Sequence, residues 1–218
     1  MRLTSLDYGS LLSYTPRGAS TEMQHSKDVM LALKTDGFIT DPSPIPMSQW
    51  MARTVQQQRL KLPFASFFQP NTILVPVPSS SLMQPDTLWV PDRIATALAK
   101  MGIGREVVAC LVRTTALRKA AWTDSSERPK PREHVDTIGV QGRISSPDEI
   151  LLVDDIVTRG ATLLGAANRL AEAFPAARIR AFAAMRTISD PSDFVATYEP
   201  SSGTIQYRDP TGDTLRRP

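Results

Sequence analysis

Cysteine and histidine are scarce in this chain of 218 residues, which has one cysteine, Cys110, and two histidines. One cysteine allows no internal disulfide and no cysteine-based metal cluster. Because Cys110 lies within an apolar run, we expect it to be a small core residue. No run approaches the roughly 18 apolar residues of a membrane span, and the first ten residues lack the apolar core of a signal peptide. These absences predict a cytoplasmic protein with no membrane partner.

The charge is nearly balanced, with 25 Lys and Arg against 22 Asp and Glu, a formal net charge of +3. Proteins that bind nucleic acid usually gather their basic residues on one face or in one run. Here they are scattered, with small concentrations at residues 113–132 and in the C-terminal tail. The charge therefore suits a small phosphate-bearing ligand as well as it suits nucleic acid, and it selects neither.

Apolar and amphipathic segments alternate along the middle of the chain. Amphipathic periodicity predicts helices at 22–35, 47–60, 93–101 (with Asp92 as its cap) and 162–174. Apolar runs predict strands at 72–78, 107–112, 150–153 and 179–185, with a weaker strand at 134–140. Strands alternating with helices predict an α/β fold whose mainly parallel sheet is covered on both faces. We expect a core at 71–188, an N-terminal helical extension or hood at 1–70, and a C-terminal extension at 189–218.

The segment 150–163 carries the clearest chemical signal. An apolar strand is followed by two carboxylates, Asp154 and Asp155, and then by a short loop that opens a helix. Gly160 allows the backbone to approach an anion closely, and the helix N-terminus adds unpaired N–H donors and a partial positive charge. Thr158 and Thr162 offer hydroxyl groups. The pattern predicts a phosphate site beside a pair of acids suited to the diol of a ribose.

A simpler interpretation remains open, because an acid or threonine at such a junction can serve only to cap the helix. The order of apolar strand, paired acids, Thr-x-Gly-x-Thr and amphipathic helix disfavours it. A Walker P-loop is excluded, since no Gly-Lys-Ser/Thr sequence occurs here.

The sequence from Val153 to Thr162, VDDIVTRGAT, resembles the phosphoribosyl pyrophosphate (PRPP) binding motif of the type I phosphoribosyltransferases. The resemblance implies that family's fold, with Asp154 and Asp155 holding the ribose hydroxyls. It also implies a 5′-phosphate cradle formed by Val157, Thr158, Arg159, Gly160, Ala161 and Thr162. Arg159 departs from the family, which commonly has threonine there. Its cation either strengthens phosphate binding or points to solvent.

Two further segments match the family by position. The stretch 75–80, VPVPSS, resembles the loop that contacts pyrophosphate, which implies roles for Pro78, Ser79 and Ser80; an ordinary strand end is the alternative. Residues 113–134 occupy the place of the flexible catalytic loop, which excludes water and brings cations to the pyrophosphate. The candidate cations are Arg113, Arg118, Lys119 and Arg128, each of which could instead be merely solvated. His134 is the better of the two histidines for a site role.

Within the family, the order of these segments is similar to the competence-associated, ComF-type branch, although its Arg-Gly-Phe-Asn signature and cysteine-rich zinc module are absent. The resemblance implies a glycosyltransferase of nucleotide metabolism that moves phosphoribosyl from PRPP to a nitrogen acceptor, with Mg²⁺ as cofactor. The acceptor would be recognised by residues 1–70 or 189–218, where Phe194, Tyr198 and Tyr207 could stack on a ring. One alternative is a catalytically inactive protein of DNA or RNA metabolism that binds PRPP or a nucleoside monophosphate as a regulator, or that binds a partner. Another is a protein that binds nucleic acid directly. A homodimer is left open.

Overall fold

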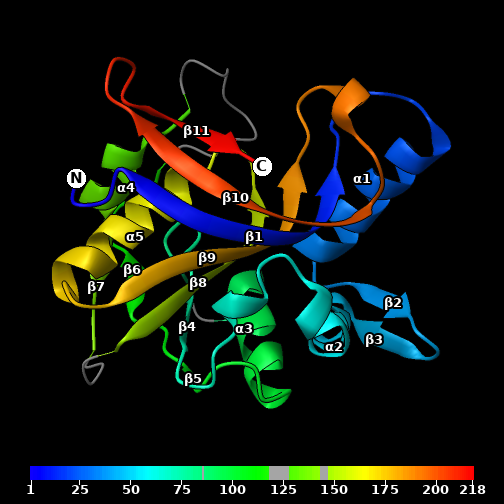
Figure 1. Ribbon diagram of the computed structural model, residues 1–218, viewed down its shortest axis with the longest axis horizontal. Coiled ribbons are helices and arrows are strands. Elements are labelled where there is room, and N and C mark those ends of the chain that lie inside the picture. The colour runs from blue at the N-terminus through cyan, green and yellow to red at the C-terminus, as the bar shows by residue number, and fades with distance from the viewer. Residues whose placement is uncertain (85, 118–127, 143–146) are drawn as a thin grey trace.

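A seven-stranded sheet forms the centre of the computed structural model, which describes residues 1–84, 86–117, 128–142 and 147–218 (Figure 1). Its strand order is β11-β10-β1-β9-β8-β4-β5. The five strands β1, β9, β8, β4 and β5 run parallel, whereas β10 and β11 are antiparallel to their neighbours. The strands are β1 (Ser5–Tyr14), β4 (Ile73–Pro76), β5 (Glu106–Val107), β8 (Glu149–Val157), β9 (Arg178–Thr187), β10 (Tyr198–Arg208) and β11 (Asp213–Arg217).

Helices cover both faces of this sheet. Along β8, side chains alternate between two separate cores: Leu151 and Val153 pack into one, Ile150 and Leu152 into the other. The first core includes residues of α1 (Thr21–Lys34), α2 (Met47–Gln58) and α3 (Val90–Lys100), and the second includes residues of α5 (Ala161–Ala173). Strands buried on both faces are typical of parallel sheets. The predicted α/β class, with a mainly parallel sheet between two helical layers, is confirmed.

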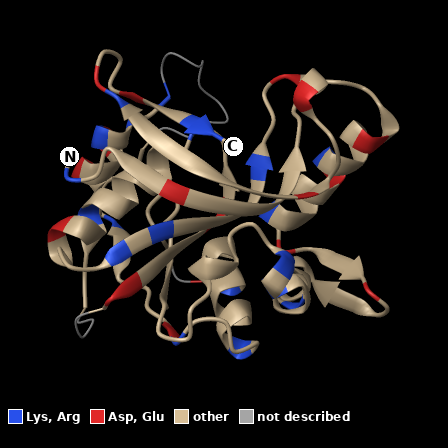
Figure 2. Cartoon of the chain, viewed as in Figure 1, with Lys and Arg blue, Asp and Glu red and all other residues tan. Residues whose placement is uncertain are grey.

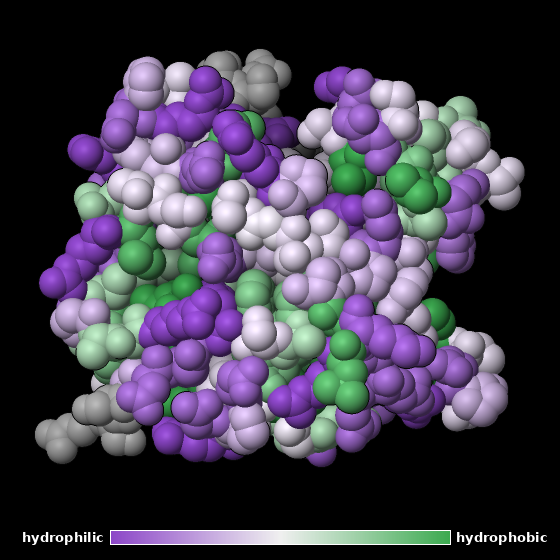
Figure 3. Space-filling view, viewed as in Figure 1, coloured by the Kyte–Doolittle hydropathy of each residue, from purple (hydrophilic) through white to green (hydrophobic). Residues whose placement is uncertain are grey.

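Short elements complete the fold. The hairpin β2 (Phe38–Thr40) and β3 (Pro44–Pro46) precedes α2, which is followed by two 3-10 turns, Arg59–Lys61 and Ala65–Phe67. A second antiparallel pair joins β6 (Leu111–Arg113) to β7 (Ile138–Val140), and α4 (Pro131–Thr137) packs beside α5. A last 3-10 turn, Pro191–Asp193, lies before β10. On the face shown in Figure 3, hydrophobic residues form small patches among hydrophilic ones.

The structure confirms the four predicted helices and changes three local details. α3 begins at Val90, with Pro91 in its first turn, so Asp92 lies inside the helix and does not cap it. Proline is favoured at the first helical position, which explains the earlier start. His134 belongs to helix α4 and not to a strand, because Pro131 and a bond from Lys130 N to the Glu133 carboxylate start a helical turn there. The predicted strand 107–112 is divided between β5 and β6, which lie in different sheets.

Both flanking segments contribute strands to the central sheet. β1 lies between β9 and β10, and β10 and β11 form one edge. The division into a core at 71–188 with extensions at 1–70 and 189–218 stays a prediction. If it holds, the two extensions join the core through the pairing of β1 with β9. Among the described residues, no helix is both long enough and apolar enough to cross a bilayer.

Candidate phosphoribosyl site

The carboxyl ends of the parallel strands lie at one edge of the sheet, which is where ligands bind in open α/β sheets. β8 reaches this edge later than the sequence predicts, because it stays paired with β9 as far as Val157 opposite Arg186. Asp154 and Asp155 therefore lie inside the strand, just before its last two residues, and not at the start of the loop. The prediction that the strand ends at Val153 is wrong, since backbone pairing continues through polar residues.

The two acids differ in environment. Asp154 is 8% exposed, and its Oδ1 accepts a hydrogen bond from the Asp155 amide at 2.9 Å. Burial raises the pKa of Asp154 well above its usual range, and the neighbouring Asp155 carboxylate raises it further. Asp155 is more open, and its carboxylate accepts from the Ile156 amide at 2.7 Å and lies 4.0 Å from Lys34 Nζ. Because Asp155 is partly exposed and Lys34 lies no closer than 4.0 Å, the Asp155 carboxylate oxygens can still accept hydrogen bonds from hydroxyl groups.

The predicted phosphate loop has the backbone geometry that an anion site requires. Gly160 stands at the N-cap of α5 with φ +86°, in the left-handed region that favours glycine. A Cβ atom there would lie 2.6 Å from Ile205 Cδ1, so β10 also closes the space beside it. Thr158 Oγ1 lies 3.0 Å from Thr187 Oγ1, and Ala161 begins the helix. The loop and the helix N-terminus are thus held in one fixed arrangement.

Arg159 is not directed simply to solvent. Its guanidinium forms an ion pair with Asp213 at the start of β11. The Arg159 guanidinium, which replaces the threonine common in the family, therefore attaches the loop to the C-terminal hairpin.

Arg216 was not predicted as a site residue from the sequence, although two of its hydrogen bonds reach this edge. It donates to the Thr158 carbonyl at 2.7 Å, to the Thr187 carbonyl at 2.5 Å and to the Tyr8 hydroxyl at 2.7 Å. The first two groups lie at the ends of β8 and β9, so one guanidinium fixes both strand ends. Figure 2 shows the cationic residues of β11 close to the C-terminus. The sequence gives no sign of this role, because an arginine in a C-terminal segment is ordinarily solvated.

A chain of polar contacts links the other predicted segments. Arg113, on β6, donates to the Ser79 carbonyl at 2.9 Å and to Thr137 Oγ1 at 2.7 Å. Its guanidinium also lies 3.4 Å from His134 Nδ1, and His134 Nε2 lies 3.4 Å from Thr162 Oγ1. The loop at Ser79, the base of the basic segment and the start of α5 therefore meet through two buried side chains, Arg113 and His134.

The protonation of this chain follows from its donors. Arginine can only donate, so His134 Nδ1 accepts and the ring proton sits on Nε2, facing Thr162. Burial lowers the pKa of His134 to about 3, with the Arg113 charge as a second cause, and burial lowers the pKa of Arg113 to about 10. At neutral pH His134 is uncharged, whereas Arg113 remains a cation at the sheet edge.

The remaining predicted residues are placed unequally. Ser80 accepts a hydrogen bond from the Leu117 amide at 2.8 Å, which brings the start of the basic segment against the loop that contains Pro78. Arg128 is described, and its Nε is buried without a hydrogen-bond partner among the described residues. Arg118 and Lys119 lie outside the described residues, so their predicted catalytic role stays a prediction.

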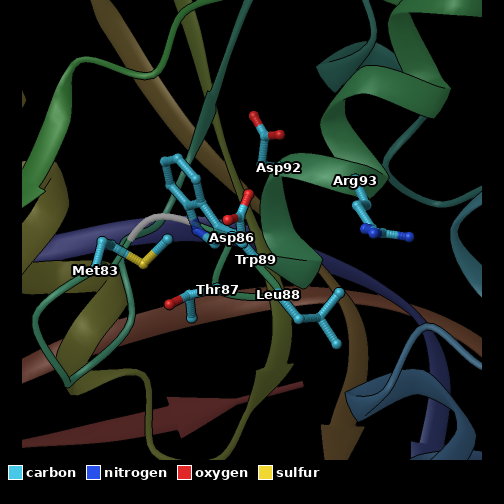
Figure 4. Close-up of a pocket in the computed structure, with 7 residues that line it drawn as sticks. All are labelled: Met83, Asp86, Thr87, Leu88, Trp89, Asp92 and Arg93. Carbon is cyan, nitrogen blue, oxygen red and sulfur yellow. The ribbon is translucent and has the colours of Figure 1, made fainter.

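A hollow of about 380 Å³ lies at the carboxyl end of β4. In Figure 4 the carboxyl groups of Asp86 and Asp92 lie between the Trp89 ring and Arg93. Trp89 Nε1 donates to the Val77 carbonyl at 2.8 Å, and the Val77 amide donates to Val153 at 2.9 Å, directly before Asp154. These two bonds connect one wall of the hollow to the backbone of β8 one residue before the paired acids.

The carboxylates at this edge suit Mg²⁺, which binds proteins through one or two acids and completes its shell with water and substrate phosphates. Asp154 and Asp155 are such a pair. No group of three or more acidic, histidine or cysteine side chains gathers as an all-protein metal site in the described part of the chain. The donor set fits an ion carried in with a phosphorylated ligand.

Comparisons with known proteins identify no family. No family model matches the chain, and no curated protein matches it. Among solved structures, it is similar to a hypoxanthine phosphoribosyltransferase from Staphylococcus aureus, at 12% identity over 69% of this chain and 70% of that one, with a TM-score of 0.30. A likeness at this score adds no argument, so the functional conclusion rests on the residues themselves.

Proposed function

We propose that this protein binds PRPP at the carboxyl edge of its sheet and transfers the phosphoribosyl group to a nitrogen acceptor. The observation that carries the proposal is the contact chain from Ser79 through Arg113 and His134 to Thr162. It joins three segments that the sequence assigned separately to pyrophosphate, catalytic loop and 5′-phosphate. The buried cation Arg113, the N-terminus of α5 and the paired acids on β8 together match the charges of a phosphoribosyl compound.

The chemistry requires positioning more than a protein nucleophile. The acceptor nitrogen forms a bond to C1 of the ribose as the C1–O bond breaks, pyrophosphate leaves with the electron pair, and the nitrogen proton passes to water. The α5 N-terminus would hold the 5′-phosphate, Asp154 and Asp155 the hydroxyls, and Arg113 the departing pyrophosphate. Bound Mg²⁺ would neutralise phosphate charge, held by Asp154 and Asp155 together with the ligand's oxygens.

The test separates binding from transfer. Calorimetry with PRPP and Mg²⁺ measures binding, and release of pyrophosphate is followed with adenine, guanine, hypoxanthine and uracil as acceptors. The proposal expects binding that is lost in the double variant Asp154→Asn, Asp155→Asn, and release that depends on one class of base. Asp28→Asn, an exposed substitution on α1, is the matched charge control and should bind as the wild type does.

The outcomes distinguish the alternatives. Tight binding of PRPP or a nucleoside monophosphate with no turnover for any base would replace the enzyme with a ligand sensor. Salt-dependent binding to DNA or RNA, without binding of PRPP, would overturn both, because nucleic-acid affinity falls steeply as phosphate contacts compete with counterions.

A further inference from the structure

A second hollow, of about 280 Å³, lies between α1, α2 and the ends of β1 and β10. Both flanking segments of the chain contribute to it. Most of its walls are apolar, and they also hold a carboxylate, an imidazole, an indole and a phenol. The lining residues are Leu12, Glu22, His25, Val29, Ile39, Met47, Trp50, Thr197 and Tyr198.

The hollow lies within reach of the paired acids on the same edge of the sheet. Ile156, next after Asp155, is opposite Met185 on β9, which is opposite Leu12 in the wall of the hollow. Two strand spacings of about 4.8 Å separate Ile156 from Leu12. A ribose with an attached heterocyclic ring can bridge this span, whereas a pentose alone cannot.

Helix α1 connects the two places along its length. Its last residue, Lys34, has Nζ 4.0 Å from the Asp155 carboxylate, while His25 and Val29 line the hollow. Because Lys34, His25 and Val29 are on one helix, α1 holds the hollow at a fixed distance from Asp155. The α5 N-terminus lies against the other core, which places the 5′-phosphate of a bound ligand away from the hollow.

Glu22 gives the hollow an oriented acceptor. Its Oε1 accepts from Thr197 Oγ1 at 2.9 Å and from the Thr197 amide at 3.3 Å. These two bonds lower the pKa of Glu22, and the bond from the Thr197 hydroxyl has the larger effect. Glu22 is therefore a carboxylate at neutral pH. An ionised carboxylate accepts hydrogen bonds and cannot donate them. A ligand next to it must present N–H or O–H groups.

The rings add a shape requirement. Trp50 is half-buried and Tyr198 is 44% exposed, so each offers ring surface at the hollow. Aromatic side chains stack on planar ligands with little loss of conformational entropy. An apolar slot with one fixed carboxylate suits a flat ring that carries hydrogen-bond donors.

We infer that this hollow receives the acceptor of the proposed transfer, a planar nitrogen heterocycle whose N–H donors are read by Glu22 while its ring packs on Trp50 and Tyr198. The inference rests on the proposed function, since it assigns the acceptor side of that same site. It favours bases with an amino or imide group facing Glu22 over analogues that lack the donor.

The first experiment uses tryptophan fluorescence in the full chain with ribose 5-phosphate and Mg²⁺, a mixture that fills the sugar site without reaction. Adenine, guanine, hypoxanthine and uracil are added in turn. The inference expects saturable quenching by at least one base that is lost in Trp50→Phe and kept in Trp89→Phe. Quenching lost only in Trp89→Phe would overturn it, because the ring would then lie in the hollow beside Asp92.

The second experiment tests the carboxylate. Glu22→Gln keeps an oxygen for Thr197 but loses the charge, so base affinity should fall about 10- to 100-fold, the loss of one charge-assisted hydrogen bond. Asp28→Asn, on the same helix, should have no effect. Unchanged base affinity in Glu22→Gln overturns the inference. Tyr198→Ala, an exposed change, should weaken the base without altering thermal unfolding.

The two proposals fail in different ways. If wild type and Glu22→Gln bind ribose 5-phosphate equally and Glu22→Gln binds the base more weakly by the expected factor, both proposals are supported. If both proteins bind ribose 5-phosphate and the base equally, the acceptor assignment fails and the phosphoribosyl site stands. Absence of ribose 5-phosphate binding in the wild type overturns the proposed function and the inference together.

Discussion

Arg216, near the end of the chain, donates a hydrogen bond through Nε to the backbone carbonyl of Thr158 at 2.7 Å. Its other nitrogens reach the Thr187 carbonyl and the Tyr8 hydroxyl. Thr158 belongs to the predicted phosphate loop and directly follows β8, so the C-terminal strand holds the loop at the point where it leaves the sheet. Asp213, which pairs with Arg159, attaches the same hairpin to the loop a second time.

Replacing Arg216 by alanine should therefore affect the phosphate site and the fold together. Two partly buried carbonyls and a tyrosine hydroxyl lose their donor, at a cost of about 1–3 kcal/mol for each group left unpaired in the interior. We expect a clear fall in the urea midpoint and weaker binding of ribose 5-phosphate, measured by calorimetry. Arg217→Ala, one exposed residue further on, is the control. Equal behaviour of the two variants would contradict the role of Arg216.

Gly160 should tolerate no side chain, for two reasons that can be separated. Its positive φ costs an L-residue roughly 1–2 kcal/mol, and the added Cβ would overlap Ile205, which adds about 1–3 kcal/mol of overpacking. Gly102 has φ +73° with nothing within 4 Å of a Cβ, so Gly102→Ala measures the backbone cost alone. In urea unfolding, Gly160→Ala should lose more stability than Gly102→Ala.

A second substitution completes this test. Ile205→Ala removes the overlapping side chain, so Gly160→Ala should cost less in that background than in the wild type, down to about the cost seen at Gly102. The same cost in both backgrounds would show that the contact with Ile205 does not limit the position.

The core strands and helices could be predicted because their apolar residues follow a regular period. The 162–174 helix and the 150–153 strand have such patterns, and the loop between them was found through its glycine and acids. β1 was missed because Ser10, Ser13 and Gly9 interrupt its apolar residues. Gly9 is required there by tertiary packing, since a Cβ would lie 2.4 Å from Phe64 Cγ. The sequence around Gly9 gives no sign that Phe64 packs against it.

The residues of the candidate site likewise fall into those that the sequence could predict and those that it could not. Asp154, Asp155 and Gly160 lie in one short segment, so their proximity follows from the sequence alone. Arg216 and Lys34 reach the site from residues far along the chain, through strand order that the sequence does not reveal. β10 and β11 were likewise missed, because prolines and polar residues conceal strands that have one open face.

Asp154 should make the folded state less stable as the pH rises. Burial and Asp155 raise its folded pKa above the ordinary value of 3.8, so above that pH the folded state holds a proton that the unfolded chain releases. Stability is then fullest below pH 3.8 and falls as the pH rises toward the folded pKa. Asp154→Asn removes this loss, so its stability relative to wild type should grow from pH 3.5 to 7.5 in urea unfolding. A constant difference would contradict the burial argument.

His134 predicts the opposite slope. Burial and the Arg113 charge lower its folded pKa to about 3 from an ordinary 6.5, so between these values the unfolded chain binds a proton that the folded state excludes. The wild type should lose stability as the pH falls from 6.5 toward 3. His134→Gln lacks that titration; it should be less stable at pH 7, where its bonds to Arg113 and Thr162 are lost, and approach the wild type in acid.

The measurement is urea unfolding of both proteins at pH 7, 5 and 4, with His25→Gln, an exposed change on α1, as the control. His25 takes no part in the contacts with Arg113 and Thr162, so His25→Gln controls for the loss of a histidine elsewhere in the fold. Parallel curves for wild type and His134→Gln would mean that the ring takes up its proton inside the fold. The contact from Arg113 to Nδ1 could not then exist as described, since a protonated imidazole has no lone pair to accept it.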